Sequence, residues 1–100
     1  MKNIAVFGST GSIGVQTLSV CRHHPELFHV AAIVFCSNHV KGIEQIKCFR
    51  PEYIGVYDEV SAAIVREAFP EANVVSGSEA WDIAACEGVD IVVNGVSGFN

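Results

Sequence analysis

The chain has 100 residues, half of them apolar and only six of them Lys or Arg, for a formal net charge of −5. This size and composition describe one small folded domain and exclude a disordered chain. The few basic residues argue against a nucleic-acid surface, and no apolar stretch approaches the roughly 20 residues that cross a bilayer.

Strand and helix patterns alternate along the whole sequence. In chain order they predict strand, helix, strand, helix, strand, helix, strand, helix and strand at residues 2–7, 12–22, 28–35, 38–49, 53–57, 59–69, 73–75, 78–87 and 89–94. The strands are nearly continuous apolar runs, as strands buried on both faces require. Ser78 is a candidate N-cap of the last helix.

The apolar positions of the helices predict which residues face the sheet. They are Ile13, Leu18 and Cys21 in the first helix, Val40, Ile43, Ile46 and Phe49 in the second, and Ala63, Ile64 and Ala68 in the third. Trp81 is expected to belong to the core.

This alternation predicts an α/β fold, specifically a Rossmann-like, doubly wound and mostly parallel sheet forming a single domain over residues 1–100. Such sheets have about six strands, whereas about five are visible before Asn100. We therefore expect the sheet to be incomplete at its C-terminal end and the chain to be part of a longer protein.

Three glycines at regular spacing follow the first predicted strand without a gap. Gly8 would allow a tight exit from the strand, Gly11 would let a phosphate approach the backbone, and Gly14 would let the next helix pack closely on the sheet. A strand feeding such a turn and then a helix is the context in which α/β folds bind dinucleotides. The alternative is a turn that needs glycines for its conformation alone.

Hydroxyl side chains and amide groups accompany these glycines. Thr10 and Ser12 carry hydroxyls, and the amides from Thr10 to Ile13 lie at the predicted start of a helix, where the dipole favours an anion. The turn therefore predicts a pyrophosphate-binding site.

The end of the second predicted strand bears on cofactor choice. Sites that prefer NAD place an acidic residue there, about 20 residues past the glycines, to bind the ribose 2′-hydroxyl. This chain has no carboxylate between residues 35 and 39; Ser37 and Asn38 can donate hydrogen bonds to a 2′-phosphate, and Lys41 is close. NADP is therefore favoured over NAD. Ser37 and Asn38 also fit a helix N-cap pair, and both roles can hold together.

A third segment, Asn94 to Gly98, follows the last predicted strand. In an open α/β sheet this position borders the ligand crevice, so the segment is expected near the nicotinamide half of the cofactor. Gly95 and Gly98 fit simple turn residues equally well.

Cysteines and histidines show no metal-binding spacing. The cysteines are predicted to be buried free thiols, with a metal site or disulfide as the alternative; they are Cys21, Cys36, Cys48 and Cys86. His23, His24 and His29 fit solvated or helix-dipole roles, and His39 flanks the predicted cofactor site. No catalytic residue or metal ligand is predicted in this chain.

The stretch Gly-Ser-Thr-Gly-Ser-Ile-Gly at residues 8–14 resembles the N-terminus of the 1-deoxy-D-xylulose 5-phosphate reductoisomerase family. The resemblance extends over essentially the whole chain. It includes Thr17-Leu18, Pro25-Glu26, Phe28, Val30, Ala32, Val34, Asn38, Phe49, Pro51, the segment 89–94 and Ser97-Gly98-Phe99.

The resemblance implies an NADPH-binding part of a longer enzyme. That enzyme rearranges 1-deoxy-D-xylulose 5-phosphate and reduces the product to 2-C-methyl-D-erythritol 4-phosphate, in non-mevalonate isoprenoid biosynthesis. It implies cofactor contacts at Thr10, Gly11, Ser12, Ile13 and Asn38, and a Mg²⁺ or Mn²⁺ ion whose ligands lie beyond this chain. It also implies a homodimer with no nucleic-acid or membrane partner.

The N-terminus leaves no room for a targeting peptide, which favours the cytoplasm or a mature organellar protein.

Two departures from the family are visible. Cys36-Ser37 stands where the family commonly has Gly-Lys, which removes a positive charge near the expected 2′-phosphate, and Gly95 stands where it often has Ala.

Two alternative functions remain open. One is another NADP-dependent dehydrogenase, such as a semialdehyde dehydrogenase, and the other is a non-catalytic dinucleotide-sensing module.

Overall fold

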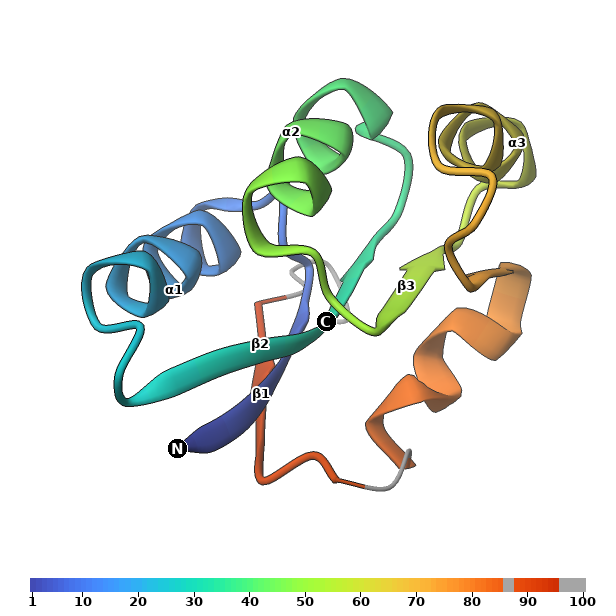
Figure 1. Ribbon diagram of the computed structural model, residues 1–100. Helices are drawn as coiled ribbons and strands as arrows, with labels where there is room; N and C mark the ends of the chain where they lie inside the picture. The colour runs from blue at the N-terminus through green and yellow to red at the C-terminus, as the bar shows by residue number, and fades with distance from the viewer. Residues whose placement is uncertain (86–87, 96–100) are drawn as a thin grey trace.

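The computed structural model describes residues 1–85 and 88–95. Within this part of the chain the elements are β1 (Lys2–Phe7), α1 (Ser12–His23), β2 (Phe28–Phe35), α2 (His39–Phe49), β3 (Tyr53–Val56), α3 (Glu59–Ala68), β4 (Val74–Ser76), the 3-10 helix η1 (Gly77–Ala85) and β5 (Ile91–Asn94) (Figure 1). The predicted alternation is confirmed. The last predicted helix was wrong in kind and in its start, because Ser78 lies inside η1 and caps no α-helix; its predicted end at Glu87 is outside the described residues.

The strands form one sheet in the order β4-β3-β2-β1-β5, and every pairing is parallel. The chain moves outward from β1 to β4 and then returns to place β5 on the other side of β1. Right-handed crossovers accordingly put α1, α2 and α3 on one face and η1 on the other (Figure 1). This arrangement confirms the Rossmann-like α/β fold. The winding of the sheet reverses between the neighbouring strands β1 and β5.

Each face of the sheet has its own core, because successive strand residues point to opposite faces. On the helical face the strands pack against Leu18, Cys21, Ile46, Ala62 and Val65. On the other face Ala5, Phe7, Ala32, Val34 and Ala80 form a smaller cluster, against which the half-buried Trp81 packs. The Trp81 ring stacks on Phe7 with centroids 5.9 Å apart. Trp81 thus packs against the core without being fully buried, so the prediction that it belongs to the core is partly confirmed.

Two predicted helix contacts with the sheet are not formed, at the first turns of α1 and α2, and Ile13 stays a predicted cofactor contact. Ile13 is 54% exposed and Val40 is 68% exposed, because both lie beyond the carboxyl ends of the strands, where no sheet remains to cover them. Leu18 and Ile46, deeper in the same helices, are buried as predicted.

The predicted face of α3 is also wrong. Its buried residues are Ser61, Ala62 and Val65, whereas the predicted Ala63, Ile64 and Ala68 are exposed. Ala62 and Val65 pack into the core on the helical face, and at the start of the helix Ser61 Oγ donates to the Ser37 carbonyl at 3.0 Å. Apolarity alone did not reveal these contacts.

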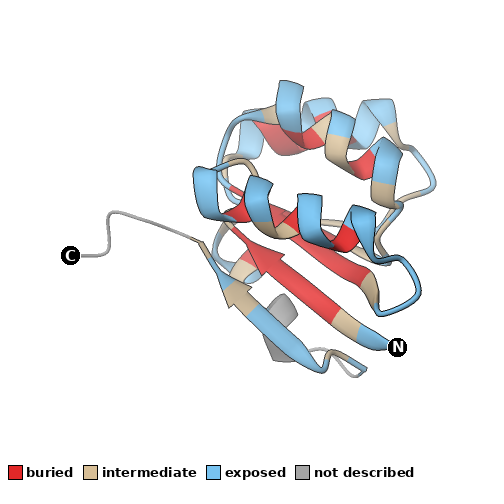
Figure 2. Cartoon of the chain, turned by 90° about the vertical axis from the view of Figure 1, so that its left-hand side faces the viewer, coloured by how far each residue is buried: buried red, intermediate tan, exposed pale blue. Residues whose placement is uncertain are grey.

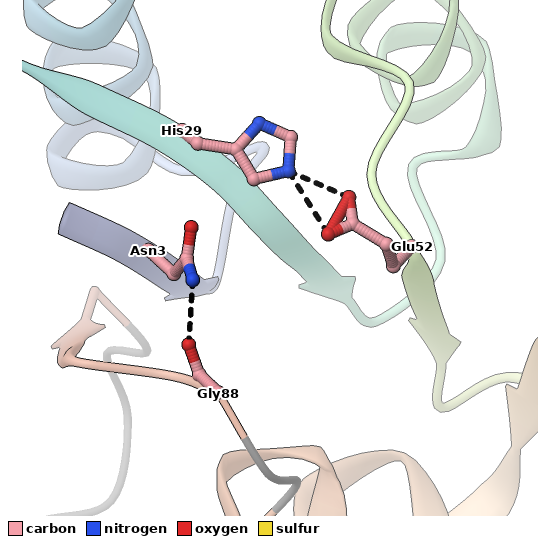
Figure 3. Close-up of polar contacts among 4 residues, drawn as sticks. All are labelled: Asn3, His29, Glu52 and Gly88. Carbon is pink, nitrogen blue, oxygen red and sulfur yellow. Dashed lines mark hydrogen bonds and ion pairs between the residues drawn. The ribbon is translucent and has the colours of Figure 1, made fainter. Parts of the chain in front are cut away.

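Polar contacts hold the edges of the sheet in register (Figure 3). The Asn3 side chain donates to the Gly88 carbonyl at 2.8 Å, and the Asn3 amide donates to Asp90 Oδ2 at 2.8 Å. His29 Nε2 lies 2.6 Å from Glu52 Oε1, and the His29 side chain is 37% exposed, so His29 is partly solvated, as predicted, and also pairs with Glu52. These contacts fasten β5 to β1 and the start of β3 to β2.

The central strands are buried while β5 is largely exposed (Figure 2). Ile91 and Val92 are 37% and 49% exposed on this edge strand. Among the described helices, none has the length and apolarity needed to span a bilayer.

Candidate functional site

The turn after β1 is fastened to the neighbouring strand. The amides of Gly8 and Ser9 both donate to the Val34 carbonyl, at 2.8 and 3.1 Å. Gly8 has φ +76°, a left-handed conformation that glycine adopts without strain. The predicted reason for a glycine at the strand exit is therefore confirmed.

Gly14 and Gly11 differ in what surrounds them. A Cβ on Gly14 would come 2.6 Å from Ser9 Cα, so packing of α1 against the turn requires glycine, as predicted. A Cβ on Gly11 would lie 3.4 Å from the Gly8 carbonyl, an ordinary contact. Protein packing therefore leaves room for a side chain at Gly11, and its predicted role toward a ligand remains a prediction.

The N-terminus of α1 leaves its amide donors available. Its N-cap is Gly11, which makes no side-chain cap bond. Within the described part of the chain, no protein acceptor bonds to the amides of Thr10, Ser12 or Ile13. By contrast, α2 and α3 are capped by the side chains of Asn38 and Asp58. Free amides at a helix start form a site for an anion.

Ser37 and Asn38 lie at the carboxyl end of β2 and are exposed. Asn38 Oδ1 accepts a bond of 3.3 Å from the Lys41 amide, so Asn38 caps α2. This bond uses the oxygen of the side-chain amide and leaves its NH₂ group as a donor. The helix begins at His39, so Asn38 alone is the cap and the predicted cap pair was half right.

Ser37 contributes to the local structure through its backbone. Its carbonyl accepts bonds from the His39 amide at 2.8 Å and from Ser61 Oγ at 3.0 Å. Ser61 Oγ also lies 2.9 Å from Asp58 Oδ2. The hydrogen bonds from the Ser61 backbone and hydroxyl lower the pKa of the Asp58 carboxyl, with a smaller effect of His39 in the same direction. This network joins the starts of α2 and α3.

The end of β5 meets the glycine turn. The Gly95 amide donates to the Phe7 carbonyl at 2.7 Å, and a Cβ on Gly95 would lie 3.2 Å from both the Gly14 nitrogen and Ile13 Cβ. The third predicted segment thus borders the turn as far as Gly95. Val96, Ser97, Gly98 and Phe99 lie outside the described residues.

A cavity of about 600 Å³ lies at the carboxyl ends of β2, β3 and β4, and Ser37 is one of its lining residues. It is lined by Cys36, Ser37, Tyr57, Asp58, Glu59, Val60, Gly77 and Ser78. Apart from Ser37, sequence reasoning did not place these residues at the site. Their place in the sequence could have indicated them, because every lining residue follows a parallel strand and so lies at the same edge of the sheet.

The cysteine prediction was only partly right. Cys21 is buried, and desolvation raises the pKa of its thiol. Cys36 and Cys48 are exposed, contrary to the prediction, and all three are free; Cys86 is outside the described residues.

Among the described residues no group of His, Cys, Asp and Glu side chains could hold a metal ion. This part of the chain therefore does not fit a magnesium or manganese site.

A parallel sheet that reverses its winding beside a glycine turn, with free amides at the helix start, defines the Rossmann-like class of dinucleotide-binding folds. The chain belongs to the 1-deoxy-D-xylulose 5-phosphate reductoisomerase family, whose model matches residues 4–100. This match confirms the resemblance seen in the sequence and favours it over the two alternative functions.

Individual relatives agree with the family. The 1-deoxy-D-xylulose 5-phosphate reductoisomerase of Chlamydia felis is 43% identical over 98% of this chain. A crystal structure of the reductoisomerase with magnesium superposes with a TM-score of 0.91 at 29% identity over 99% of this chain. Another, with NADPH, fosmidomycin and magnesium, gives 0.89 at 29% identity over 96% of the chain.

This chain spans about a quarter of these relatives, namely 26% of the Chlamydia felis protein and 26% and 24% of the two solved chains.

Proposed function

We propose that this chain is the NADPH-binding part of a 1-deoxy-D-xylulose 5-phosphate reductoisomerase. The observation that carries the proposal is the uncapped start of α1 at the winding reversal, between the glycine turn and Gly95. Family membership and a structural relative solved with NADPH support it.

The pyrophosphate would bind at the glycine turn. The free amides of Thr10, Ser12 and Ile13 would donate to its oxygens, and the dipole of α1 would add a favourable interaction of roughly 0.3–1 kcal/mol. Gly11 would contribute open space for the phosphates, while Gly8 and Gly14 give the turn its shape. The Thr10 and Ser12 side chains add hydroxyl donors.

The ribose 2′-phosphate would bind beside the start of α2. The Ser37 hydroxyl and the NH₂ group of Asn38 are donors, and Lys41 supplies a positive charge one helical turn away. The cavity that Ser37 helps to line would bind the adenosine half of the cofactor. No carboxylate lies between residues 35 and 39, and the carboxylates that line the same cavity, Asp58 and Glu59, follow β3 instead.

In the whole enzyme, bound NADPH supplies the hydride that reduces the rearranged substrate. The residues of this chain hold and orient the cofactor. We propose that the remainder of a longer protein supplies the catalytic residues and the ligands of Mg²⁺ or Mn²⁺, since the described residues offer no metal site. The substrate would be 1-deoxy-D-xylulose 5-phosphate, the product 2-C-methyl-D-erythritol 4-phosphate, and the pathway non-mevalonate isoprenoid biosynthesis.

We also propose that the whole enzyme is a cytoplasmic homodimer without nucleic-acid or membrane partners. The acidic balance of the chain supports the first exclusion. The cytoplasmic location, the homodimer and the absence of a membrane partner are what the resemblance to the family implies.

The test is the thermal unfolding of this chain with increasing NADPH, and separately with NADH. A ligand that binds the native state raises the midpoint with its concentration. A larger shift with NADPH than with NADH supports the proposed site. Equal shifts would show that Ser37 and Asn38 do not recognise the 2′-phosphate, and a cooperative transition without any shift would overturn the proposal.

A matched variant sharpens this test. Ser37→Lys adds the positive charge that the family commonly has at this place, on an exposed residue whose described hydrogen bonds are made by its backbone carbonyl. It should enlarge the NADPH shift and leave the NADH shift unchanged.

A further inference from the structure

We propose that Gln45, on α2, is a positioning residue that fixes the orientation of the phosphate-binding turn. This inference rests on the proposed function of that turn. Gln45 does not touch the expected cofactor itself; it acts through the backbone of Ser9.

The contact is a long-range hydrogen bond. Gln45 Nε2 donates to the Ser9 carbonyl at 2.7 Å, across 36 positions of the chain. Ser9 is fully buried, and its own amide donates to Val34 at 3.1 Å. The Ser9 backbone is therefore held by β2 on one side and by α2 on the other.

Peptide geometry converts this bond into an orientation of the next amide. The peptide between Ser9 and Thr10 is planar and trans, so its N–H points opposite to its C=O. Because the carbonyl points to Gln45, the Thr10 N–H points away from α2. Within the described residues this amide has no protein acceptor, so it is free to donate to a phosphate oxygen.

The polar atoms around this bond are incompletely paired. Among the described residues, Ser9 Oγ and Gln45 Oε1 are both buried without a hydrogen-bond partner. Buried polar atoms are usually paired, and unpaired ones reduce stability. The Gln45 side chain therefore satisfies one buried acceptor, the Ser9 carbonyl, while its own oxygen stays unpaired. The bond fixes the direction of the Ser9 carbonyl.

The position of Gln45 also joins the two halves of the proposed site. Its helix begins after Asn38, beside the expected 2′-phosphate, and Gln45 reaches the turn that would hold the pyrophosphate. Movement of α2 relative to the turn would therefore break the bond to Ser9.

The experiment compares the full chain with Gln45→Met, which keeps the side-chain length and removes the donor. Dissociation constants are measured for NADPH, which has a pyrophosphate, and for adenosine 2′-monophosphate, which lacks one, by NMR titration of backbone amides. Ile43→Val, a partly buried position on the same helix, is the control for a general loss of stability.

Gln45→Met should raise the dissociation constant of NADPH about threefold to tenfold, the range expected for one lost hydrogen bond. The constant for adenosine 2′-monophosphate should stay within about twofold, and Ile43→Val should change neither by more than that. The Thr10 amide signal should shift in the free variant and move less on adding NADPH.

Equal weakening of both ligands, or no weakening of NADPH, would overturn the role of Gln45 while leaving the proposed function standing. Failure of the unsubstituted chain to bind NADPH would instead overturn the proposed function and this inference with it. If Gln45→Met does not fold, Gln45→Leu carries the same test, because it also removes the donor without adding a charge.

Discussion

The ring of Phe35, at the end of β2, lies directly against Gly42 of α2. A Cβ on Gly42 would come 2.5 Å from Phe35 Cε1. Phe35 is fully buried, so its ring has little freedom to move aside. This contact draws α2 close to the end of β2, where Ser37 and Asn38 connect the two elements.

Gly42→Ala should destabilise the chain although alanine is the better helix former. Overpacking costs about 1–3 kcal/mol, which exceeds the helix-propensity gain of roughly 1 kcal/mol. Urea unfolding measures the change. Lys47→Ala, at an exposed position of the same helix, is the control and should change stability little. A Gly42→Ala chain as stable as the original would contradict the close packing.

Gly14→Ala should mainly lose stability, whereas Gly11→Ala should mainly lose NADPH binding. A Cβ on Gly14 would meet the backbone of Ser9 at 2.6 Å, so this variant should lose about 3 kcal/mol or more. Gly11→Ala has room for its methyl group and should lose about 1 kcal/mol as an N-cap substitution. It should nevertheless lose most of the NADPH-dependent rise in midpoint. Unfolding scans with and without NADPH measure both effects, and a retained NADPH shift in Gly11→Ala would count against the ligand role of Gly11.

Asn38→Asp should reverse the cofactor preference without removing the helix cap. Aspartate caps a helix as well as asparagine does, but its carboxylate would repel a 2′-phosphate and accept bonds from a 2′-hydroxyl. The affinity for NADPH should fall about tenfold and that for NADH should rise. Fluorescence titration with each cofactor measures the constants. Asn38→Ser keeps a capping oxygen without the charge, so a similar reversal in that variant would show that charge is not the cause.

Stability should fall in acid partly through Asp58. The folded-state pKa of this carboxyl is lowered by its bonds from Ser61. A lowered pKa means that ionised Asp58 favours folding above the unfolded-state value of about 3.9, and that the contribution disappears as pH falls through the folded-state pKa. Asp58→Asn should therefore show a flatter decline of the urea midpoint below about pH 5. Parallel pH profiles for the two chains would exclude this contribution.

Patterns among neighbouring residues were sufficient to predict most of the fold. The apolar runs of the strands and the helix signals between them depend on nearby residues, so the alternation was correct, with element ends differing by a residue or two. The shape of the glycine turn was predictable for the same reason. Gly8 needs a positive φ, and Gly14 lies within a few residues of the backbone that it must clear.

Contacts between distant segments were not predictable in this way. The apolar pattern of α3 favoured Ala63 and Ile64 as its buried face, whereas Ser61, Ala62 and Val65 are buried and Ser61 bonds to the Ser37 carbonyl, 24 positions away. Sequence reasoning also overlooked Gln45, a polar residue on an ordinary amphipathic helix whose partner lies 36 positions away.

By itself, the sequence determined the α/β class, the glycine turn and the absence of an acidic residue after β2, because each depends on residues close in the chain. Tertiary structure decided where those features meet. The parallel pairing of β5 with β1 brings Gly95 against the turn, and the packing of α2 on Phe35 accompanies the contact of Gln45 with Ser9. These contacts join residues far apart in sequence, and they form only when the whole sheet and its helices pack together.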